Sequence, residues 1–473
     1  MGTEVKPVQF AVNRHDDLMT RTSDRLWEYA EVGMKESKSA EYIASVLEDA
    51  GFDVQRGVAG LPTAIMASFT SDAGGQSPVI GVAVEYDALA GLSQDRVPFR
   101  KPRTKGQPGH GCGHNLIASA GLGAVLACKD LMQASGLPGT IRYYGCPAEE
   151  SKIGKVVMVR EGLLDDVDAV IAWHPGDDNS AQPINYNAFD SARFTFEGTG
   201  AHAAGSPHEG RSALDAVELM NVGANYLREH IVPQARLHYI IEHGGDDPNV
   251  VPHEASVLYY VRAPSRGDVT DIHHYLRDVA RGAALMTRTE LSHQYLLGCH
   301  DMIFNRTLGR RIHRYLCEFD APEYSKAEME FARELQHTFS QRRRREIASM
   351  YGEKALVDQC FYPGVEPPRE EESRGSGSAD ICEVSQVVPT VQFSTACAPL
   401  GTPGHSWQNA AVSGTSIGHK GTLYAARVIA ATAMDLLTDR ELIRQAREEF
   451  RSSQSESYVS PLDEEHWSGS PYA

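Results

Sequence analysis

The sequence is poor in cysteine, has no CxxC pair and shows no signal for secretion. Its eight cysteines are spread over 473 residues, which does not fit the dense disulfide framework of small secreted proteins. No apolar run reads as a membrane span of about 18 residues, and the start, Met1–Lys6, lacks the apolar core of a signal peptide. These absences predict a cytoplasmic protein with reduced thiols and no membrane partner.

Basic side chains are also in short supply. The 45 Lys and Arg residues are outnumbered by 63 Asp and Glu residues, for a formal net charge of −18. An acidic surface repels phosphate backbones, so nucleic acid is not expected as a partner. The run Arg342–Arg345 lies in a charged helical stretch and is interpreted as a solvated helix face. With 41% hydrophobic and 23% charged residues, the chain is predicted to be globular, with about two or three domains.

Apolar runs of strand length alternate with helical stretches on both sides of a central block. Strands are expected at 79–84, 141–144, 169–173 and 387–393, and helices at 37–50, 116–134 and 413–437. This alternation predicts an α/β domain with a mostly parallel sheet flanked by helices. The block at 191–297 instead reads β-α-β-β-α-β, the order of a split βαβ, ferredoxin-like domain.

The expected domain boundaries follow from these patterns. The α/β domain is expected over residues 15–190 and 301–440, and the inserted domain over 191–300. The first dozen residues and the end of the chain are polar and lack a periodic apolar pattern. Both are expected to be frayed, and 441–473 is expected to be a flexible tail.

Polar residues follow three of the expected strands. Glu85 and Asp87 follow 79–84, Glu149 and Glu150 follow the strand that begins at Ile141, and His174 ends the third strand. Ligands of open α/β sheets bind beyond the carboxyl ends of the strands. Because adjacent side chains diverge, one carboxylate of the Glu149–Glu150 pair can bind a metal while the other transfers a proton.

A Gly-rich segment at 109–115 carries a possible metal-binding pair. In extended backbone, side chains two residues apart point the same way, so Cys112 and His114 can reach one ion. A thiolate beside imidazole suits zinc and other transition metals. A Gly-rich turn around a buried thiol is the alternative. His110 is either a third ligand or a loop histidine, and His405 is a candidate for a further ligand.

Six motifs together resemble the amidohydrolase branch of metallopeptidase family twenty, the aminoacylase and carboxypeptidase group. They are YDAL at 86–89, GHGCGHN at 109–115, PAEES at 147–151, AWHP at 172–175, GTGAHAA at 198–204 and PGHS at 403–406. The resemblance implies a metallopeptidase-type catalytic domain with an inserted dimerisation or lid domain. It also implies two divalent ions, zinc or manganese, whose ligands match Cys112, His114, Glu150, His174 and His405.

The resemblance also implies roles for individual residues. Glu149 matches the catalytic glutamate, and Asp87 matches an acid that orients a metal-bound imidazole. His202 matches a histidine that reaches a neighbouring subunit's active site and polarises the scissile carbonyl. Asn249 matches a substrate-binding position, while Arg211 either holds a substrate carboxylate or lies on the surface.

The function implied is cleavage of the amide bond of N-acyl or N-aroyl amino acids, such as p-aminobenzoyl-glutamate, by a homodimer joined through the inserted domain. The alternatives are a metal-dependent deaminase of an aromatic amine and a non-catalytic regulatory subunit of the same fold. The complete ligand set and Glu149 argue against the regulatory subunit. Many relatives outside this branch carry a ligand histidine where this chain has Glu85, which leaves open which ligand bridges the metals.

Overall fold

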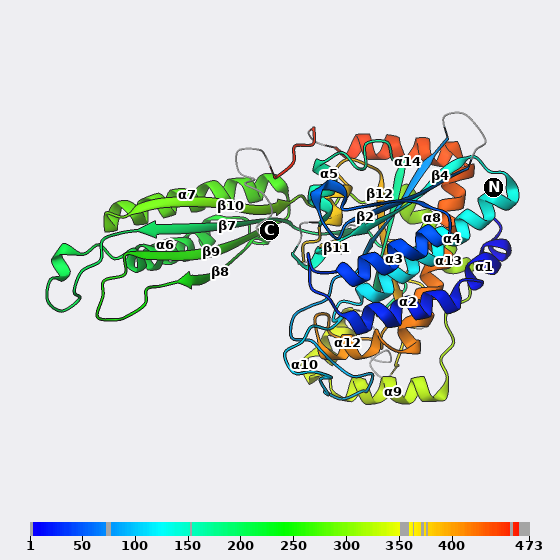
Figure 1. Cartoon of the computed structure of the whole chain (residues 1–473), viewed down its shortest axis with the longest axis horizontal. Coiled ribbons are helices and arrows are strands. Elements are labelled where there is room, and N and C mark those ends of the chain that lie inside the picture. Colours follow the sequence, from blue (N-terminus) through cyan, green and yellow to red (C-terminus); the bar gives the residue numbers. More distant parts are fainter. Residues whose placement is uncertain are drawn as a thin grey trace. The chain divides into compact units, whose positions relative to one another are not determined.

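The computed structural model folds into two compact units (Figure 1). It describes residues 3–71, 77–151, 154–350, 359–362, 364–369, 373–374, 377–454 and 457–462. So far as these residues go, unit 1 comprises Met1–Pro183, Ile303–Ser373 and Val384–Ser457. Unit 2 comprises Ile184–Met302, Arg374–Glu383 and Tyr458–Ala473, within the same limits.

A six-stranded mixed sheet forms the centre of unit 1, in the order β1-β2-β4-β3-β5-β12. Its strands are β1 (Asp53–Arg56), β2 (Ile65–Ser71), β3 (Val79–Glu85), β4 (Gly139–Cys146), β5 (Ala169–Gly176) and β12 (Thr390–Ala396). The last four are parallel neighbours, which confirms the predicted mostly parallel sheet. The antiparallel edge formed by β1 and β2 was not predicted. The carboxyl ends of the four parallel strands meet at one edge, where such sheets bind ligands.

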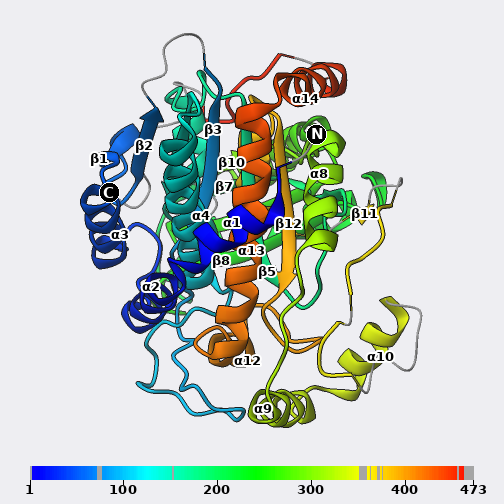
Figure 2. The same cartoon turned by 90° about the vertical axis from the view of Figure 1, so that its right-hand side faces the viewer.

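Two long apolar helices, α4 (His114–Ser135) and α13 (Ser416–Thr438), pack against each other and against this sheet (Figure 2). Close packing of α4 depends on Gly121, where a Cβ atom would lie 2.3 Å from Cγ1 of Val84. Contrary to expectation, α4 is long and apolar enough to span a membrane, but 83% of its apolar window is buried inside the structure. It is therefore a core helix of unit 1.

Both segments expected to be frayed contain helices. The buried residues are Val8, Ala11 and Val12 in α1 (Val5–Asn13) and Leu442, Ile443 and Ala446 in α14 (Arg440–Ser453). A stripe of three or four apolar side chains stabilises a short helix once a core is available to cover it, which a local sequence pattern does not reveal. The tail expected at 441–473 is therefore helical as far as Ser453, and 463–473 lies outside the described residues.

The other described α-helices have the following bounds. They are α2 (Asp16–Tyr29), α3 (Ser37–Asp49), α5 (Gly154–Arg160), α6 (Ala213–Leu227), α7 (Arg266–Thr287), α8 (Arg306–Glu318), α9 (Lys326–His337), α10 (Gln341–Met350), α11 (Ile381–Val384) and α12 (Trp407–Val412). The arginine run at 342–345 lies in α10, as predicted, and Arg342 donates to Glu346 at 2.8 Å.

Unit 2 contains a four-stranded antiparallel sheet in the order β10-β7-β9-β8. Its strands are β7 (Ala188–Glu197), β8 (Arg236–His243), β9 (Glu254–Ala263) and β10 (Glu290–Cys299). Helices α6 and α7 pack together and against this sheet. The chain order β7-α6-β8-β9-α7-β10 confirms the predicted split βαβ fold. A separate two-stranded pair joins β6 (Ile184–Asn185) to β11 (Ser373–Arg374).

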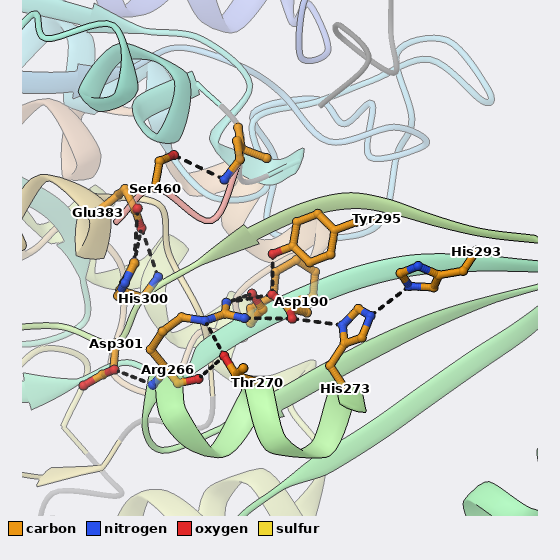
Figure 3. A network of polar contacts seen from close by, with 12 residues as sticks. Asp190, Arg266, Thr270, His273, His293, Tyr295, His300, Asp301, Glu383 and Ser460 are labelled. Carbon is orange, nitrogen blue, oxygen red and sulfur yellow. Dashed lines mark hydrogen bonds and ion pairs between the residues drawn. The ribbon is translucent and has the colours of Figure 1, made fainter. Parts of the chain in front are cut away.

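A buried carboxylate connects three elements of unit 2 (Figure 3). Asp190 in β7 accepts hydrogen bonds from both terminal nitrogens of Arg266 in α7, at 2.7 and 2.8 Å. It also lies 3.0 Å from Nδ1 of His273 and accepts from the hydroxyl of Tyr295 in β10. Burial alone would raise the pKa of Asp190, but Arg266 and His273 hold it below its usual value. The network therefore keeps a charge inside the unit by pairing it.

Candidate metal centre

The predicted metal ligands of unit 1 gather beyond the carboxyl ends of the parallel strands. Asp87 follows β3, Glu149 and Glu150 follow β4, and His174 lies in β5. The segment that enters α4 contributes Cys112 and His114, and the loop before α12 contributes His405. Parallel strands bring these segments to one edge because all four end there.

His114 lies at the centre of this group and is fully buried. Its Nδ1 is 2.8 Å from Oδ1 of Asp87, so Nδ1 carries the proton and Nε2 offers a lone pair. Nε2 lies 3.4 Å from Oε2 of Glu85 and 3.9 Å from both Glu149 and Glu150. Asp87 thus orients the imidazole so that its free nitrogen faces three carboxylates.

Cys112 and His174 approach the group from opposite elements. The Sγ atom of Cys112 is 3.4 Å from Nε2 of His174. The other ring nitrogen, Nδ1, bonds to the carbonyl oxygen of Pro175 at 2.9 Å. Because Nδ1 donates to that carbonyl, Nε2 of His174 is oriented toward the thiol, as a metal ligand would be.

Glu150 connects the centre to the late loop of unit 1. Its Oε2 is 3.3 Å from Nε2 of His405, and its backbone amide donates to Oδ2 of Asp87 at 2.9 Å. His405 has a left-handed backbone conformation, with φ of 51°, and a largely exposed side chain. Its amide donates to the carbonyl of Gly111 at 3.0 Å, which fixes the loop beside the segment that carries Cys112.

These donors form three overlapping triads suited to a cation. The ligand atoms within each triad lie within 4.8 Å of one another. The triads are Cys112–His114–His174, Cys112–Glu150–His405 and Glu85–His114–Glu149.

Three buried atoms in these triads have no hydrogen-bond partner among the described residues: Oε2 of Glu85, Nε2 of His114 and Oε1 of Glu150. Buried polar atoms are normally bonded, so converging unpartnered lone pairs are the arrangement that a cation would satisfy. Thiolate and imidazole donors fit zinc, and imidazole with carboxylate also fits manganese. The residues therefore fit a site for transition-metal ions.

The electrostatics of the centre favour ligand protonation states that bind metal. Burial alone would raise the pKa of the Cys112 thiol, but His174 and His114 hold it well below its usual value. Burial would lower the pKa of His174, but Cys112 raises it to about 9. Burial raises the pKa of Glu150 to about 8. The thiolate is the form of cysteine that coordinates metals, and a cation would replace the protons held by its neighbours.

Lys155 is a buried cation that the sequence analysis missed. Its Nζ donates to Oε1 of Glu85 at 2.7 Å, and both side chains are almost fully buried. The available signal was a single lysine in the apolar run Val156–Val159 of α5. Glu85, which stands where many relatives have a histidine, is therefore part of the centre and is paired through one oxygen.

His110 lies outside the three triads. It is buried, and its Nε2 is 2.9 Å from the carbonyl oxygen of Leu26. Burial lowers its pKa to about 4, so the ring is neutral near neutral pH. Of the two interpretations open for His110, the structure favours a loop histidine that joins the Gly-rich segment to α2.

The remaining three predicted residues belong to unit 2 and lie on paired segments. His202 bridges to Val250 in antiparallel fashion, and Ala203 donates its amide to the carbonyl of Asn249 at 2.9 Å. Arg211 bridges to Thr199. The side chains of His202 and Asn249 are exposed and that of Arg211 is partly exposed. One exposed loop region of unit 2 thus carries all three.

The hydrogen bonds of His202 determine its tautomer. Its Nδ1 accepts from the backbone amides of Ala204 and Gly205, at 3.2 Å each. An acceptor Nδ1 leaves the ring proton of a neutral imidazole on Nε2. His202 therefore presents an exposed hydrogen-bond donor.

The fold recurs in solved structures. It matches a dinuclear metal-binding peptidase of the M20 family from Bacillus subtilis with a TM-score of 0.58 and 17% identity, covering 90% of this chain and 99% of the other. It also matches an aminobenzoyl-glutamate utilization protein from Klebsiella pneumoniae with a TM-score of 0.59 and 18% identity, covering 89% and 96%. These similarities confirm the predicted fold class of a metallopeptidase-type domain with a smaller inserted domain.

Sequence comparison identifies the family. The description Peptidase family M20/M25/M40 applies to a family model that matches residues 81–435. One of the subunits of the p-aminobenzoyl-glutamate hydrolase of Escherichia coli (strain K12) is 41% identical over 457 residues, or 94% of each chain. The Xaa-Arg dipeptidase of Mus musculus is 28% identical, covering 85% of this chain and 80% of its own length. The chain therefore belongs to peptidase family M20/M25/M40 and is, as the motifs predict, a hydrolase that acts on an amide bond.

Proposed function

We propose that this chain hydrolyses the amide bond of an N-acyl or N-aroyl amino acid, with p-aminobenzoyl-glutamate or a closely related compound as its substrate. The similarity to a p-aminobenzoyl-glutamate hydrolase subunit over 94% of both chains supports this substrate class. The single observation that carries the proposal is the convergence of unpartnered donor atoms of Glu85, His114 and Glu150 close to Glu149.

Two divalent ions, zinc or manganese, are proposed to be held by the five metal-binding side chains. Those side chains are Cys112, His114, Glu150, His174 and His405. When bound, such ions lower the pKa of a water and polarise the substrate carbonyl. Asp87 fixes the donor nitrogen of His114, and its second oxygen holds the amide of Glu150. Asp87 thereby aligns two ligands at once.

Glu149 is proposed as the general base and acid of the reaction. Its carboxylate lies at the edge of the donor group, 3.9 Å from Nε2 of His114, and is nearly buried. A carboxylate in this position takes a proton from the attacking water and returns it to the leaving amine. Removing a general base commonly lowers the rate by about a hundred- to ten-thousand-fold.

His202 is proposed to donate to the developing oxyanion, and Asn249 and Arg211 to bind the substrate. The Nε2 proton of His202 suits the first role. We propose that His202 acts in the site of a second copy of the chain, in a homodimer joined through the inserted domain. β8 is an edge strand of the unit 2 sheet and carries the exposed side chains Ile240 and Ile241, which a second copy would cover.

A cytoplasmic location is proposed as well. All eight cysteines are free, and reduced thiols are typical of proteins in that compartment. The Cys112 thiolate that the metal site requires would be lost in a disulfide.

The test of the proposal is the Glu149→Gln variant. It is expected to bind metal as the parent does and to release amine from p-aminobenzoyl-glutamate at least a hundred-fold more slowly. Glu161→Gln, which alters an exposed glutamate just after α5, is the matched control and should retain full activity. A Glu149→Gln variant that turns over at the parent rate would refute the proposed role of Glu149. A purified, metal-loaded parent that hydrolyses no N-acyl or N-aroyl amino acid would refute the substrate class.

A further inference from the structure

The backbone just before Glu149 has a conformation that its sequence does not favour. Ala148 is a non-glycine residue in the left-handed region, with φ of 55°. Only glycine adopts this region freely, because the Cβ of other residues approaches the backbone too closely. Surrounding contacts must therefore hold Ala148 in place, and strain of this kind is concentrated at functional sites.

A buried carboxylate on a distant segment provides one such contact. Glu36, which precedes α3 and is fully buried, accepts a hydrogen bond through Oε1 from the amide of Ala148 at 2.8 Å. Its Oε2 bonds to Oγ1 of Thr63 at 2.9 Å. The carbonyl of Thr63 accepts in turn from the hydroxyl of Tyr86, which fixes the far side of the network. None of these contacts belongs to the metal-binding triads.

Packing and a second carboxylate complete the support. Gly33 leaves space for Ala148, since a Cβ atom at position 33 would lie 3.0 Å from Cβ of Ala148. On the other side of Glu149, Oδ2 of Asp87 accepts from the amide of Glu150 at 2.9 Å. The peptide groups before and after Glu149 are therefore each tied to a buried carboxylate.

We propose that Glu36 is a positioning residue for the general base: it holds Ala148 in the left-handed conformation and so directs Glu149 toward the substrate carbonyl and its attacking water. The inference rests on the proposed function, because it takes Glu149 as the base. A shift of about 1 Å in a catalytic group costs on the order of a hundred-fold in rate. Loss of the Glu36 contact should therefore lower kcat much more than it changes KM.

Two substitutions of Glu36 separate its hydrogen bonds from its volume. In Glu36→Gln the amide oxygen can still accept from Ala148 and the amide nitrogen can donate to Thr63, so kcat should stay within about three-fold of the parent. In Glu36→Leu the acceptor is lost, and kcat should fall about 10- to 100-fold while KM changes less than three-fold. A Glu36→Leu variant with parental kcat would overturn the proposal.

The rescue experiment distinguishes positioning from stability alone. Glycine adopts positive φ without support, so Ala148→Gly should have little effect in the parent and should restore at least five-fold of the kcat lost in Glu36→Leu. The matched control is Glu328→Leu, which removes a buried carboxylate that caps α9 and binds Lys420. Its Tm should fall while kcat stays unchanged. A similar fall of kcat in both leucine variants, or no rescue by Ala148→Gly, would overturn the proposal.

A further variant tests the same point if Glu36→Leu does not fold. Gly33→Ala keeps Glu36 but pushes a methyl group against Ala148, and it should lower kcat at least five-fold with little change in KM. Parental kcat in Gly33→Ala would overturn the proposal in that case. The proposed function is judged separately, because full activity in Glu149→Gln would refute the role of Glu149 whatever the Glu36 variants do.

Discussion

The Nζ atom of Lys155 lies 2.7 Å from Oε1 of Glu85, and both residues are almost fully buried. The other oxygen of Glu85 is 3.4 Å from Nε2 of His114 and has no hydrogen-bond partner within the described part of the chain. One oxygen thus pairs with a cation of α5, and the other faces the metal-binding group. Lys155 both offsets the charge of Glu85 and directs its free oxygen.

Breaking this ion pair should destabilise the protein strongly. Lys155→Met keeps much of the volume but leaves the Glu85 carboxylate buried without its cation, and the free energy of unfolding should fall by about 3–5 kcal/mol in urea denaturation of the metal-free protein. Lys326→Met, at a highly exposed position, should change it by less than about 0.5 kcal/mol. The double variant Lys155→Met/Glu85→Leu should recover much of the loss. A loss below about 1 kcal/mol in Lys155→Met would contradict this account.

Metal content should report directly on the proposed ligands. Purified protein should contain close to two divalent ions per chain, measured by elemental analysis. Cys112→Ala and His174→Ala each remove one donor of the triad shared with His114, so both should lose metal and activity together. Cys128→Ala, at a buried cysteine in α4 that bonds to a backbone carbonyl, serves as the control and should keep both ions. Full occupancy in both ligand variants would mean that other residues hold the metal.

Asp87 should affect metal affinity without binding metal itself. Asp87→Asn weakens the hydrogen bond that orients His114 and replaces an acceptor of the Glu150 amide, so metal affinity should fall about 10- to 100-fold. Chelator competition measures this change. Asp166→Asn alters an exposed carboxylate bonded to Arg142 and should leave affinity unchanged. Unchanged affinity in Asp87→Asn would contradict the orienting role.

The buried Glu36 should make stability depend on pH. Burial raises the pKa of Glu36 to about 7, whereas an unfolded chain titrates this carboxyl near its ordinary value of about 4.3. Between these values the unfolded state has released the proton and the folded state has kept it, so stability falls as pH rises. The loss reaches at most about 3 kcal/mol. Glu36→Gln, compared with the parent by urea denaturation from pH 4.5 to 8, should lack this fall.

Glu328→Gln serves as the control for the pH experiment. Burial would raise the pKa of Glu328, but Lys420 and Ser416 hold it at about 2. The carboxyl group is then ionised in both states throughout the range studied, so the difference between this variant and the parent should not change with pH. A difference between parent and Glu36→Gln that is equally flat would contradict the raised pKa.

Mixed dimers test the role of His202 across subunits. Glu149→Gln and His202→Ala should each reduce kcat at least a hundred-fold. A heterodimer of the two variants has one site with an intact Glu149 served by the intact His202 of the other chain, and it should recover up to half the parent activity. His208→Ala, an exposed histidine of the same loop region, should be active by itself. Verified heterodimers without activity would refute action between subunits.

The elements that the sequence predicted are those whose signals are local. The apolar runs at 79–84 and 169–173 are strands, and the β-α-β-β-α-β pattern of the insertion is the order observed. The motifs also identified the side chains that the structure brings together, from Cys112 to His405. A run of buried side chains or a short motif is encoded within a few residues, so it can be recognised without knowing the fold.

Tertiary structure decided the contacts that hold these groups in position. Glu36 and Ala148 are 112 residues apart, and Glu85 and Lys155 are 70 apart, and neither pair has a sequence pattern that marks it. The short helices α1 and α14 likewise depend on a core supplied by distant segments. The sequence by itself determined which donors and which fold this chain has. Only the folded chain decided which buried charges face one another, because a carboxylate leaves water for the interior only where the tertiary structure supplies its partner.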